Sequence, residues 1–225
     1  MIELHPPLII VNFKAYREVE GASALTIAKE CQAVAEESGV SIIACPPMVE
    51  LSRVATSVRI PTMSQHADPK APGSATGWVT PDMIKAAGAV GTLVNHSEHR
   101  MMMKDVATIV EASSKIGLRT CVCADTPRTT GIMARNHPDM VAVEPPELIG
   151  GDVSVTDARP EVVAEAVEAA RKVDATIPVL CGAGVKTGRD VSRALELGAK
   201  GVLLASGVVK SINPRAALLD LVGRI

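Results

Sequence analysis

Residues 90–98 read Val-Gly-Thr-Leu-Val-Asn-His-Ser-Glu, a short apolar run that passes directly into polar residues. Its continuous apolar character is typical of a strand that is buried on both faces of a parallel sheet. Seven further runs of β-branched or small residues, separated by helix-like stretches, have the same character. With Val90–Asn95 they predict eight parallel strands; the other seven are Leu8–Phe13, Val40–Cys45, Ile60–Ser64, Leu118–Cys123, Met140–Val143, Ile177–Cys181 and Gly201–Ala205.

The stretches between these runs predict helices, most clearly at Ala22–Glu37, Arg159–Lys172, Thr187–Leu197 and Pro214–Val222. Strand and helix alternate without a repeat, a linker or a low-complexity tract, which indicates one α/β domain over residues 1–225. Eight such units favour a (β/α)8 barrel. A doubly wound open sheet is the competing fold, but no Gly-rich dinucleotide fingerprint follows the first run.

Composition excludes several classes of function. The formal net charge of -2 argues against a basic nucleic-acid-binding protein. The aromatic residues are Phe13, Tyr16 and Trp78, too few for a base-stacking surface. No apolar run is long enough to span a membrane, and the first residues lack the layout of a signal peptide. We therefore expect neither nucleic acid nor membrane among the partners.

The five cysteines are an odd number, and most lie in or beside apolar runs. This placement is typical of small buried hydrophobic residues in a reducing compartment, so the sequence predicts a cytoplasmic protein. Cys121 and Cys123 could be read as a metal-binding pair. No second pair of Cys or His stands at a suitable spacing, so we expect no metal site.

In a (β/α)8 barrel the active site lies at the carboxyl ends of the strands. The first, fourth and sixth runs end in polar residues at Asn12–Lys14, Asn95–Glu98 and Glu144, and the last two end in small-residue turns at Gly182–Gly184 and Ala205–Gly207. A lysine or glutamate after a strand is usually a solvated charge, but all of these residues converge on one mouth. A cation, an acid–base pair and backbone donors suit a small, phosphorylated substrate.

These segments, together with Ile149-Gly150-Gly151, resemble the triosephosphate isomerase family in order and over nearly the whole chain. The short stretch between His96 and Glu144 resembles the compact archaeal branch of that family. The resemblance implies a single TIM barrel and the reversible isomerisation of glyceraldehyde 3-phosphate and dihydroxyacetone phosphate, without metal or organic cofactor. It also implies a homo-oligomer, dimer or tetramer, in which the loop around Thr76 enters the neighbouring subunit's site.

The same resemblance assigns roles residue by residue. Glu144 matches the catalytic base, His96 the electrophile and Lys14 the cation that faces the substrate, with Glu98 as the carboxylate that pairs with this lysine. The implied substrate-binding residues are Asn12, Lys14, Ile149, Gly150, Gly184, Ala205 and Ser206.

Some features depart from the family or stay open. His99 stands where the family more often has arginine, and Gly182–Gly184 lacks the serine of many members. Met101–Met103 could pack in the core or contact another subunit. We expect Pro145–Gly151 to form a mobile lid, because two prolines fix its start and two glycines free its end. Two other functions remain open: an aldolase with a Schiff-base lysine, and a phosphate-binding barrel without catalysis.

Overall fold

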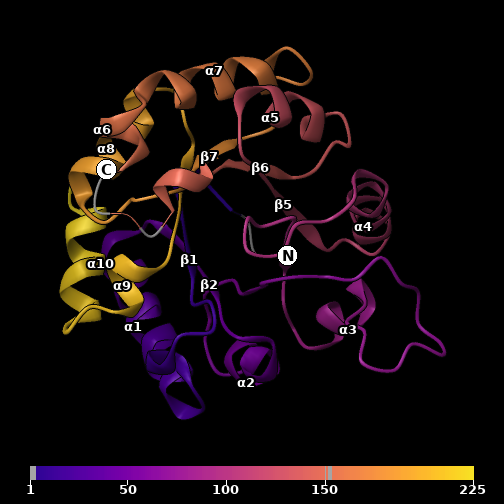
Figure 1. Cartoon of the computed structure of the whole chain (residues 1–225). Coiled ribbons are helices and arrows are strands. Elements are labelled where there is room, and N and C mark those ends of the chain that lie inside the picture. Colours follow the sequence, from indigo (N-terminus) through magenta and orange to yellow (C-terminus); the bar gives the residue numbers. More distant parts are fainter. Residues whose placement is uncertain (1–3, 150, 152–153) are drawn as a thin grey trace.

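The computed structural model describes residues 4–149, 151 and 154–225, and shows a ring of parallel strands surrounded by helices (Figure 1). The strands are β1 (Leu8–Asn12), β2 (Ser41–Cys45), β3 (Met63–Ser64), β4 (Gly91–Val94), β5 (Arg119–Ala124), β6 (Met140–Val143), β7 (Val179–Cys181) and β8 (Gly201–Leu204). The α-helices are α1 (Ala22–Ser38), α2 (Leu51–Ala55), α3 (Pro81–Ala86), α4 (Met103–Lys115), α5 (Pro127–Ala134), α6 (Val155–Ala158), α7 (Pro160–Arg171), α8 (Gly188–Glu196), α9 (Ser206–Val209) and α10 (Pro214–Val222).

The strands form one eight-stranded parallel sheet in the order β2-β1-β8-β7-β6-β5-β4-β3. Its two outer strands meet through a parallel bridge between Ala44 and Thr62, beside a hydrogen bond from the Ala44 N–H to the Pro61 carbonyl. The sheet therefore closes on itself. The predicted (β/α)8 barrel is confirmed, and the doubly wound alternative is wrong. That residues 1–225 form a single domain stays a prediction.

Several strands are shorter than the apolar runs that predicted them. The third run begins at Ile60 but β3 begins at Met63, and the seventh begins at Ile177 but β7 begins at Val179. Pro61 and Pro178 lie in the missing parts, and proline has no N–H for the strand ladder. The fourth run ends one residue early because Asn95 takes a left-handed backbone conformation, with φ 61°.

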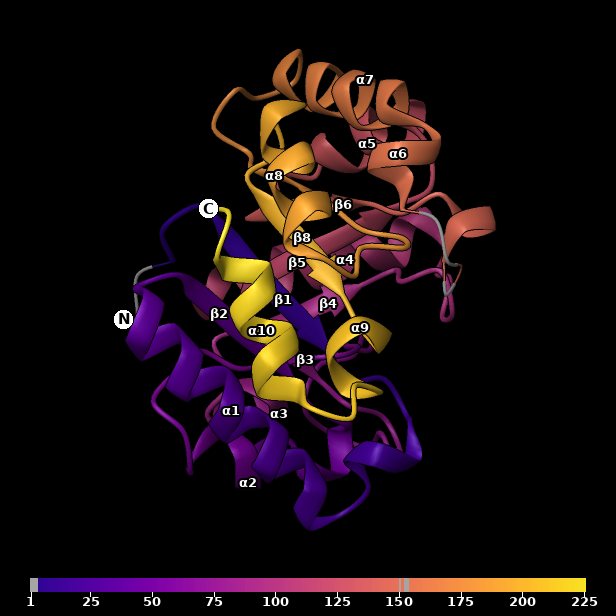
Figure 2. The ribbon, with the colours of Figure 1, turned by 90° about the vertical axis from the view of Figure 1, so that its left-hand side faces the viewer.

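The four clearest predicted helices are present as α1, α7, α8 and α10, with ends within about one residue of the prediction. Helix α1 ends where Gly39 adopts φ 74° and its N–H donates to the Ala35 carbonyl. Helix α10 begins at Pro214, and the Asn213 side chain accepts from the Ala216 N–H. Helices α1 and α10 lie side by side over β1 (Figure 2).

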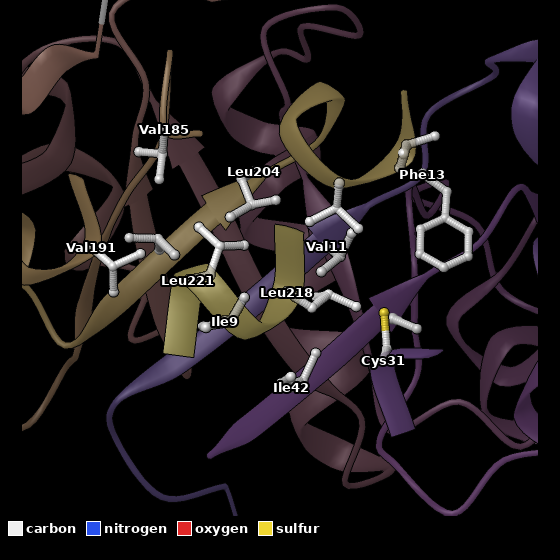
Figure 3. Packing of buried hydrophobic residues seen from close by; sticks show 14 of the residues in the cluster. Ile9, Val11, Phe13, Cys31, Ile42, Val185, Val191, Leu204, Leu218 and Leu221 are labelled. Atoms are coloured by element: carbon white, nitrogen blue, oxygen red, sulfur yellow. The ribbon is translucent and has the colours of Figure 1, made fainter. Parts of the chain in front are cut away.

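Each strand sends alternate residues inward and outward. On β1, Ile9 and Val11 face outward and pack with Leu218 and Leu221 of α10 (Figure 3). Leu8 and Ile10 of the same strand belong to the cluster that fills the barrel. Met140 and Ala142 contribute to that inner cluster from β6. Because strand side chains repeat every two residues, the next inward positions on β1 and β6 are Asn12 and Glu144.

All five cysteines are free and buried, as the sequence predicted. Cys45, Cys121 and Cys123 lie inside the barrel, and Cys31 and Cys181 lie between the sheet and the helices. Burial raises the pKa of each thiol. Across residues 4–149, 151 and 154–225, no three His, Cys, Asp or Glu side chains gather as metal ligands, and no helix is long and apolar enough to cross a membrane.

Gly201 allows β8 to approach β1. A Cβ atom there would lie 2.1 Å from the Leu8 carbonyl oxygen, and the backbone φ is +154°. We expect Gly201→Ala to lower the free energy of unfolding by at least about 2 kcal/mol, because strands β1 and β8 must separate. Gly117→Ala is the control, because the added Cβ atom is strained at φ +66° but meets no atom within 4 Å. Its free energy of unfolding should fall by only about 1 kcal/mol. Equal decreases in the free energy of unfolding of the two variants, measured by urea denaturation, would contradict this account.

Candidate active site

A small pocket of about 40 Å³ opens where the carboxyl ends of β1, β6, β7 and β8 meet the segment after β4. Every candidate catalytic and substrate-binding residue that the structure describes contributes to its lining. Gly150 lies outside the described residues. The lining consists of Asn12, Lys14, Tyr16, His96, Glu144, Ile149, Gly151, Ala183, Gly184, Val185, Leu203, Leu204, Ala205 and Ser206.

Glu144 and His96 face each other in this pocket. His96 Nε2 lies 3.5 Å from Glu144 Oε1, and both side chains are more than nine-tenths buried. The other carboxylate oxygen, Glu144 Oε2, is buried and has no hydrogen-bond partner. A buried acceptor without a partner is costly unless a ligand supplies one. The Glu144 carboxylate is therefore positioned to accept a hydrogen bond from a molecule in the pocket.

The His96 ring is held from its other side. The Glu98 backbone N–H donates to His96 Nδ1 at 3.2 Å. Because Nδ1 accepts this hydrogen bond, a neutral ring carries its proton on Nε2. That proton points into the pocket on the side of Glu144, where it can be donated to an oxygen atom.

Lys14 is fixed by contacts at both its backbone and its side chain. Its φ is 52°, a strained conformation for a residue with a side chain. Its N–H donates to Asn12 Oδ1 at 3.0 Å, and its carbonyl accepts from Gln65 Nε2 at 3.0 Å. Its Nζ lies 2.7 Å from Glu98 Oε1, so the expected Lys14–Glu98 pair is present. The lysine side chain is 12% exposed against 56% for the glutamate, which leaves the cation on the pocket side of the pair.

Gly182 determines where Glu144 lies. Its N–H donates to the Val143 carbonyl at 2.9 Å, which brings β7 against the end of β6. A Cβ atom on Gly182 would lie 2.5 Å from Glu144 Cγ and 2.9 Å from Oε1. Real atoms do not approach this closely, so only glycine admits the observed position of the glutamate side chain.

The sequence did not identify Gln65 and Tyr16 as parts of this site, and it assigned no role there to Asn95 or Gly182. Asn95 Nδ2 donates to the Cys123 carbonyl, and Asn95 Oδ1 accepts from the Met101 N–H, so this residue ties the loop after β4 to β5. Gln65 follows an apolar run directly and Asn95 ends one, much the same signal that identified Glu144. The fit of Gly182 against Glu144 and the place of Tyr16 in the lining depend on contacts between distant parts of the chain and have no such signal.

The turns after β7 and β8 form the far wall of the pocket. Ala183 and Gly184 take consecutive left-handed conformations, with φ 73° and 71°. A Cβ atom on Gly207 would lie 3.0 Å from Lys186 Cα, so the two turns pack closely together. Ser206 begins α9, and the first N–H groups of a helix have no acceptor within it. Ala183, Gly184, Ala205 and Ser206 of these two turns line the pocket, and backbone N–H groups in such turns suit an anion.

The segment after Glu144 forms a 3-10 turn at Pro146–Leu148, with Ile149 in the lining of the pocket. Glu147 on this turn pairs with Arg159 at 2.6 Å. The turn therefore lies over one side of the pocket and is held by an exposed ion pair.

The loops after β3 and β4 meet beside the pocket. The rings of His66 and His99 stack with centroids 3.9 Å apart, and His66 Nε2 lies 3.1 Å from Asp68 Oδ1. The pKa of His99 is lowered, mainly by partial burial and to a smaller extent by the charge of the neighbouring His66. The sequence assigned no role to His66, and His99 occupies the position that departs from the family.

Three neighbouring loops, those after β2, β3 and β4, also expose apolar side chains. Val49 is 90% exposed, Met102 63% and Trp78 43%. Thr76 lies in the middle loop, on an exposed stretch. Met101 packs partly against the core, whereas Met102 and Met103 are exposed, and their contact with another subunit stays a prediction.

The family model for triosephosphate isomerase matches residues 7–222 of the chain. A triosephosphate isomerase from Methanosarcina acetivorans is 47% identical over 216 residues, which cover 96% of this chain and 97% of that protein. One from Methanothermobacter thermautotrophicus is 44% identical over 97% of this chain and 96% of its own length. Both organisms are archaea, in agreement with the branch that the sequence indicated.

The structure also resembles a solved triosephosphate isomerase. The crystal structure of triosephosphate isomerase from Bartonella henselae superposes with a TM-score of 0.74 at 22% sequence identity, over 99% of this chain and 100% of that one. At this identity the likeness establishes the shared barrel, whereas the family model and the archaeal relatives establish the family. The chain therefore belongs to the triosephosphate isomerase family.

Proposed function

We propose that the chain interconverts glyceraldehyde 3-phosphate and dihydroxyacetone phosphate, as a step of glycolysis and gluconeogenesis, with Glu144 as base and His96 as electrophile. The observation that carries this proposal is the contact between Glu144 and His96 in the mouth of the barrel, at 3.5 Å, with one carboxylate oxygen left without a partner. An acceptor and a donor side by side are what a proton transfer between adjacent carbons needs.

The reaction follows from the positions of these two groups. Glu144 takes the proton from the carbon next to the carbonyl, and the electron pair of that C–H bond moves to form the enediolate. His96 Nε2–H donates to the oxygen on which negative charge develops. His96 passes its proton to that oxygen and takes the hydroxyl proton from the neighbouring oxygen, while Glu144 returns a proton to the neighbouring carbon, so that the carbonyl shifts by one position and no atom is gained or lost.

Lys14 and the turns at Gly184, Ala205 and Ser206 hold the substrate in this proposal. The Lys14 cation stabilises the phosphate and the developing oxyanion, and the buried pocket strengthens that attraction because little water screens it. Asn12 keeps the strained Lys14 backbone in place through its side-chain oxygen. Pro145–Gly151 acts as a lid that excludes water from the enediolate and prevents loss of its phosphate.

We also infer a homo-oligomer in the cytoplasm. The exposed apolar side chains of Val49, Trp78 and Met102 lie on neighbouring loops, and a second copy would cover them. The loop around Thr76 lies among them and would reach the partner's site. Five free, buried thiols suit a reducing compartment.

A Schiff-base aldolase is less well supported. Such an enzyme needs a desolvated lysine that can lose its proton. Lys14 is the one lysine among the described lining residues of the pocket, and it is paired with Glu98 at 2.7 Å. Among the described residues, no lysine is buried. A barrel that binds phosphate without catalysis would not explain why a buried oxygen of Glu144 has no hydrogen-bond partner.

Glu144→Gln tests the proposed base. The amide keeps the shape of the side chain but cannot accept the proton, so kcat should fall at least about 10²- to 10⁴-fold. Binding of phosphate-bearing inhibitors should change little, because Lys14 and the turns remain. A coupled isomerase assay measures this. A variant with a kcat near that of the wild type would remove Glu144 from the mechanism.

Gly182→Ala tests whether glycine sets the position of the glutamate. The added Cβ atom must push Glu144 aside, and a shift of about 1 Å should lower kcat by roughly 10- to 100-fold while KM changes less. Gly131→Ala is a matched control, since its Cβ atom would meet the Ala169 carbonyl oxygen at an ordinary 3.4 Å. Unchanged turnover in Gly182→Ala would show that Glu144 does not need its present place.

Met102→Glu tests the proposed subunit contact. A charge introduced into an apolar interface is costly to desolvate, so the variant should dissociate at micromolar concentration in light scattering. Ile212→Glu, at a fully exposed residue in the turn after α9, is the control and should keep the assembly of the wild type. A wild-type chain that is fully active as a monomer would contradict the inferred oligomer.

The stacked pair of His66 and His99 predicts a pH dependence of stability. The pKa of His99 is lower in the folded protein than its ordinary value near 6.5, so the unfolded chain binds the proton more readily. This contribution to stability is complete above that value and declines as the pH falls below it. Between pH 7 and 5.5 the denaturation midpoint of His99→Asn should fall less than that of the wild type. His137→Asn keeps the stacked pair, so its denaturation midpoint should change with pH as that of the wild type does. The prediction would be contradicted if the midpoints of His99→Asn and the wild type fell equally over this pH range.

A further inference from the structure

A second cavity, of about 450 Å³, lies at the amino ends of β5, β6, β7 and β8, the end of the barrel opposite the active site. Its floor consists of buried apolar side chains, among them Leu8, Met140 and Val179. Its volume falls within the range of pockets that hold small molecules, about 300–1,000 Å³. It is larger than the pocket at the active site.

Three cations line this cavity. Arg119 is the first residue of β5, Arg171 is the last residue of α7, and Lys200 directly precedes β8. Within the part of the chain that the structure describes, none of the three makes an ion pair or a side-chain hydrogen bond. By contrast, Lys172, next to Arg171, pairs with Glu168 at 3.2 Å. Three unpaired cations around one cavity stand out in a chain with a net charge of -2.

Among the lining residues that the structure describes, Asp139 is the one carboxylate, and it is already engaged. Its Oδ2 atom accepts from the Thr120 N–H at 2.8 Å and lies 3.3 Å from Thr120 Oγ1. With three cations and one carboxylate, the lining has a net charge of 3 − 1 = +2. Such a lining attracts anions, and arginine in particular suits phosphate and carboxylate groups.

The backbones that carry Arg119 and Lys200 are held by the strand ladder. The Arg119 N–H donates to the Val90 carbonyl at 2.9 Å, and the Lys200 N–H donates to the Val179 carbonyl at 2.8 Å. The Nη2 atom of Arg171 lies 3.9 Å from where a Cβ atom of Gly198 would be, so this side chain reaches over the turn before β8. A rigid backbone beneath the charged side chains lowers the entropic cost of binding a ligand.

We propose that this cavity is a binding site for a small organic polyanion that carries at least two phosphate or carboxylate groups. The charged groups of the ligand pair with Arg119, Arg171 and Lys200, and its carbon skeleton lies on the apolar floor. This site is separate from the active site, because Leu8 and Met140 lie at the amino ends of strands that lead to Asn12 and Glu144 at their other ends.

Calorimetric titration with inorganic pyrophosphate in the millimolar range tests the site. The wild type should bind one more pyrophosphate per chain than the double variant Arg171→Gln/Lys200→Gln, or bind it at least about tenfold more tightly. The control is Lys172→Gln/Arg193→Gln, which removes the same charge from cations that pair with Glu168 and Glu196. The control should bind as the wild type does.

Isomerase kinetics separate this site from the active site. Both double variants should keep the kcat, KM and inhibition by pyrophosphate of the wild type, because those values report on the active site alone. Replacing pyrophosphate with citrate distinguishes carboxylate from phosphate as the preferred group. Equal binding by the wild type and Arg171→Gln/Lys200→Gln would overturn the proposal. So would an equal loss in both double variants, or binding of neither anion outside the active site.

Discussion

Closure of the eight-stranded sheet is the constraint on which the rest of the structure depends. It is completed where Gly201 lets β8 approach Leu8 on β1, and where Ala44 bridges to Thr62 between β2 and β3. Once the sheet is closed, half of the residues on every strand must point into the barrel. Apolar side chains fill this interior up to Ile10 and Ala142, and the next inward positions are polar. A shift of one residue in register would turn each strand's inward side chains outward.

The site depends on that alignment and on short connections across it. The backbone bond from Gly182 to Val143 places a glycine where the side chain of Glu144 must pass. The Glu98 N–H orients the His96 ring, and the Glu98 carboxylate pairs with Lys14. One three-residue segment, His96–Glu98, therefore positions a donor and a cation together. The strained backbone of Lys14 is balanced by bonds to Asn12 and Gln65, which lie on different strands or their ends.

Features that depend on local sequence were predictable. The continuous apolar runs gave all eight strands, and helix α10 lies where Pro214 and Gly223 indicated. The residues that follow the strands gave most of the pocket, because parallel strands bring their carboxyl ends to one mouth. Contacts between distant segments were not predictable. Neither the fit of Gly182 against Glu144 nor the convergence of Arg119, Arg171 and Lys200 leaves a local pattern in the sequence. The pairing of His66 with His99 is of the same kind.

The central claim is that a carboxylate base in the barrel mouth moves a proton between adjacent carbons. The most direct measurement is proton NMR of dihydroxyacetone phosphate formed from glyceraldehyde 3-phosphate in D2O. A base that exchanges its proton with solvent before returning it predicts deuterium at C1 of the product. Product that forms at the normal rate with only protium at C1 would contradict the account and would indicate direct hydride transfer between the two carbons.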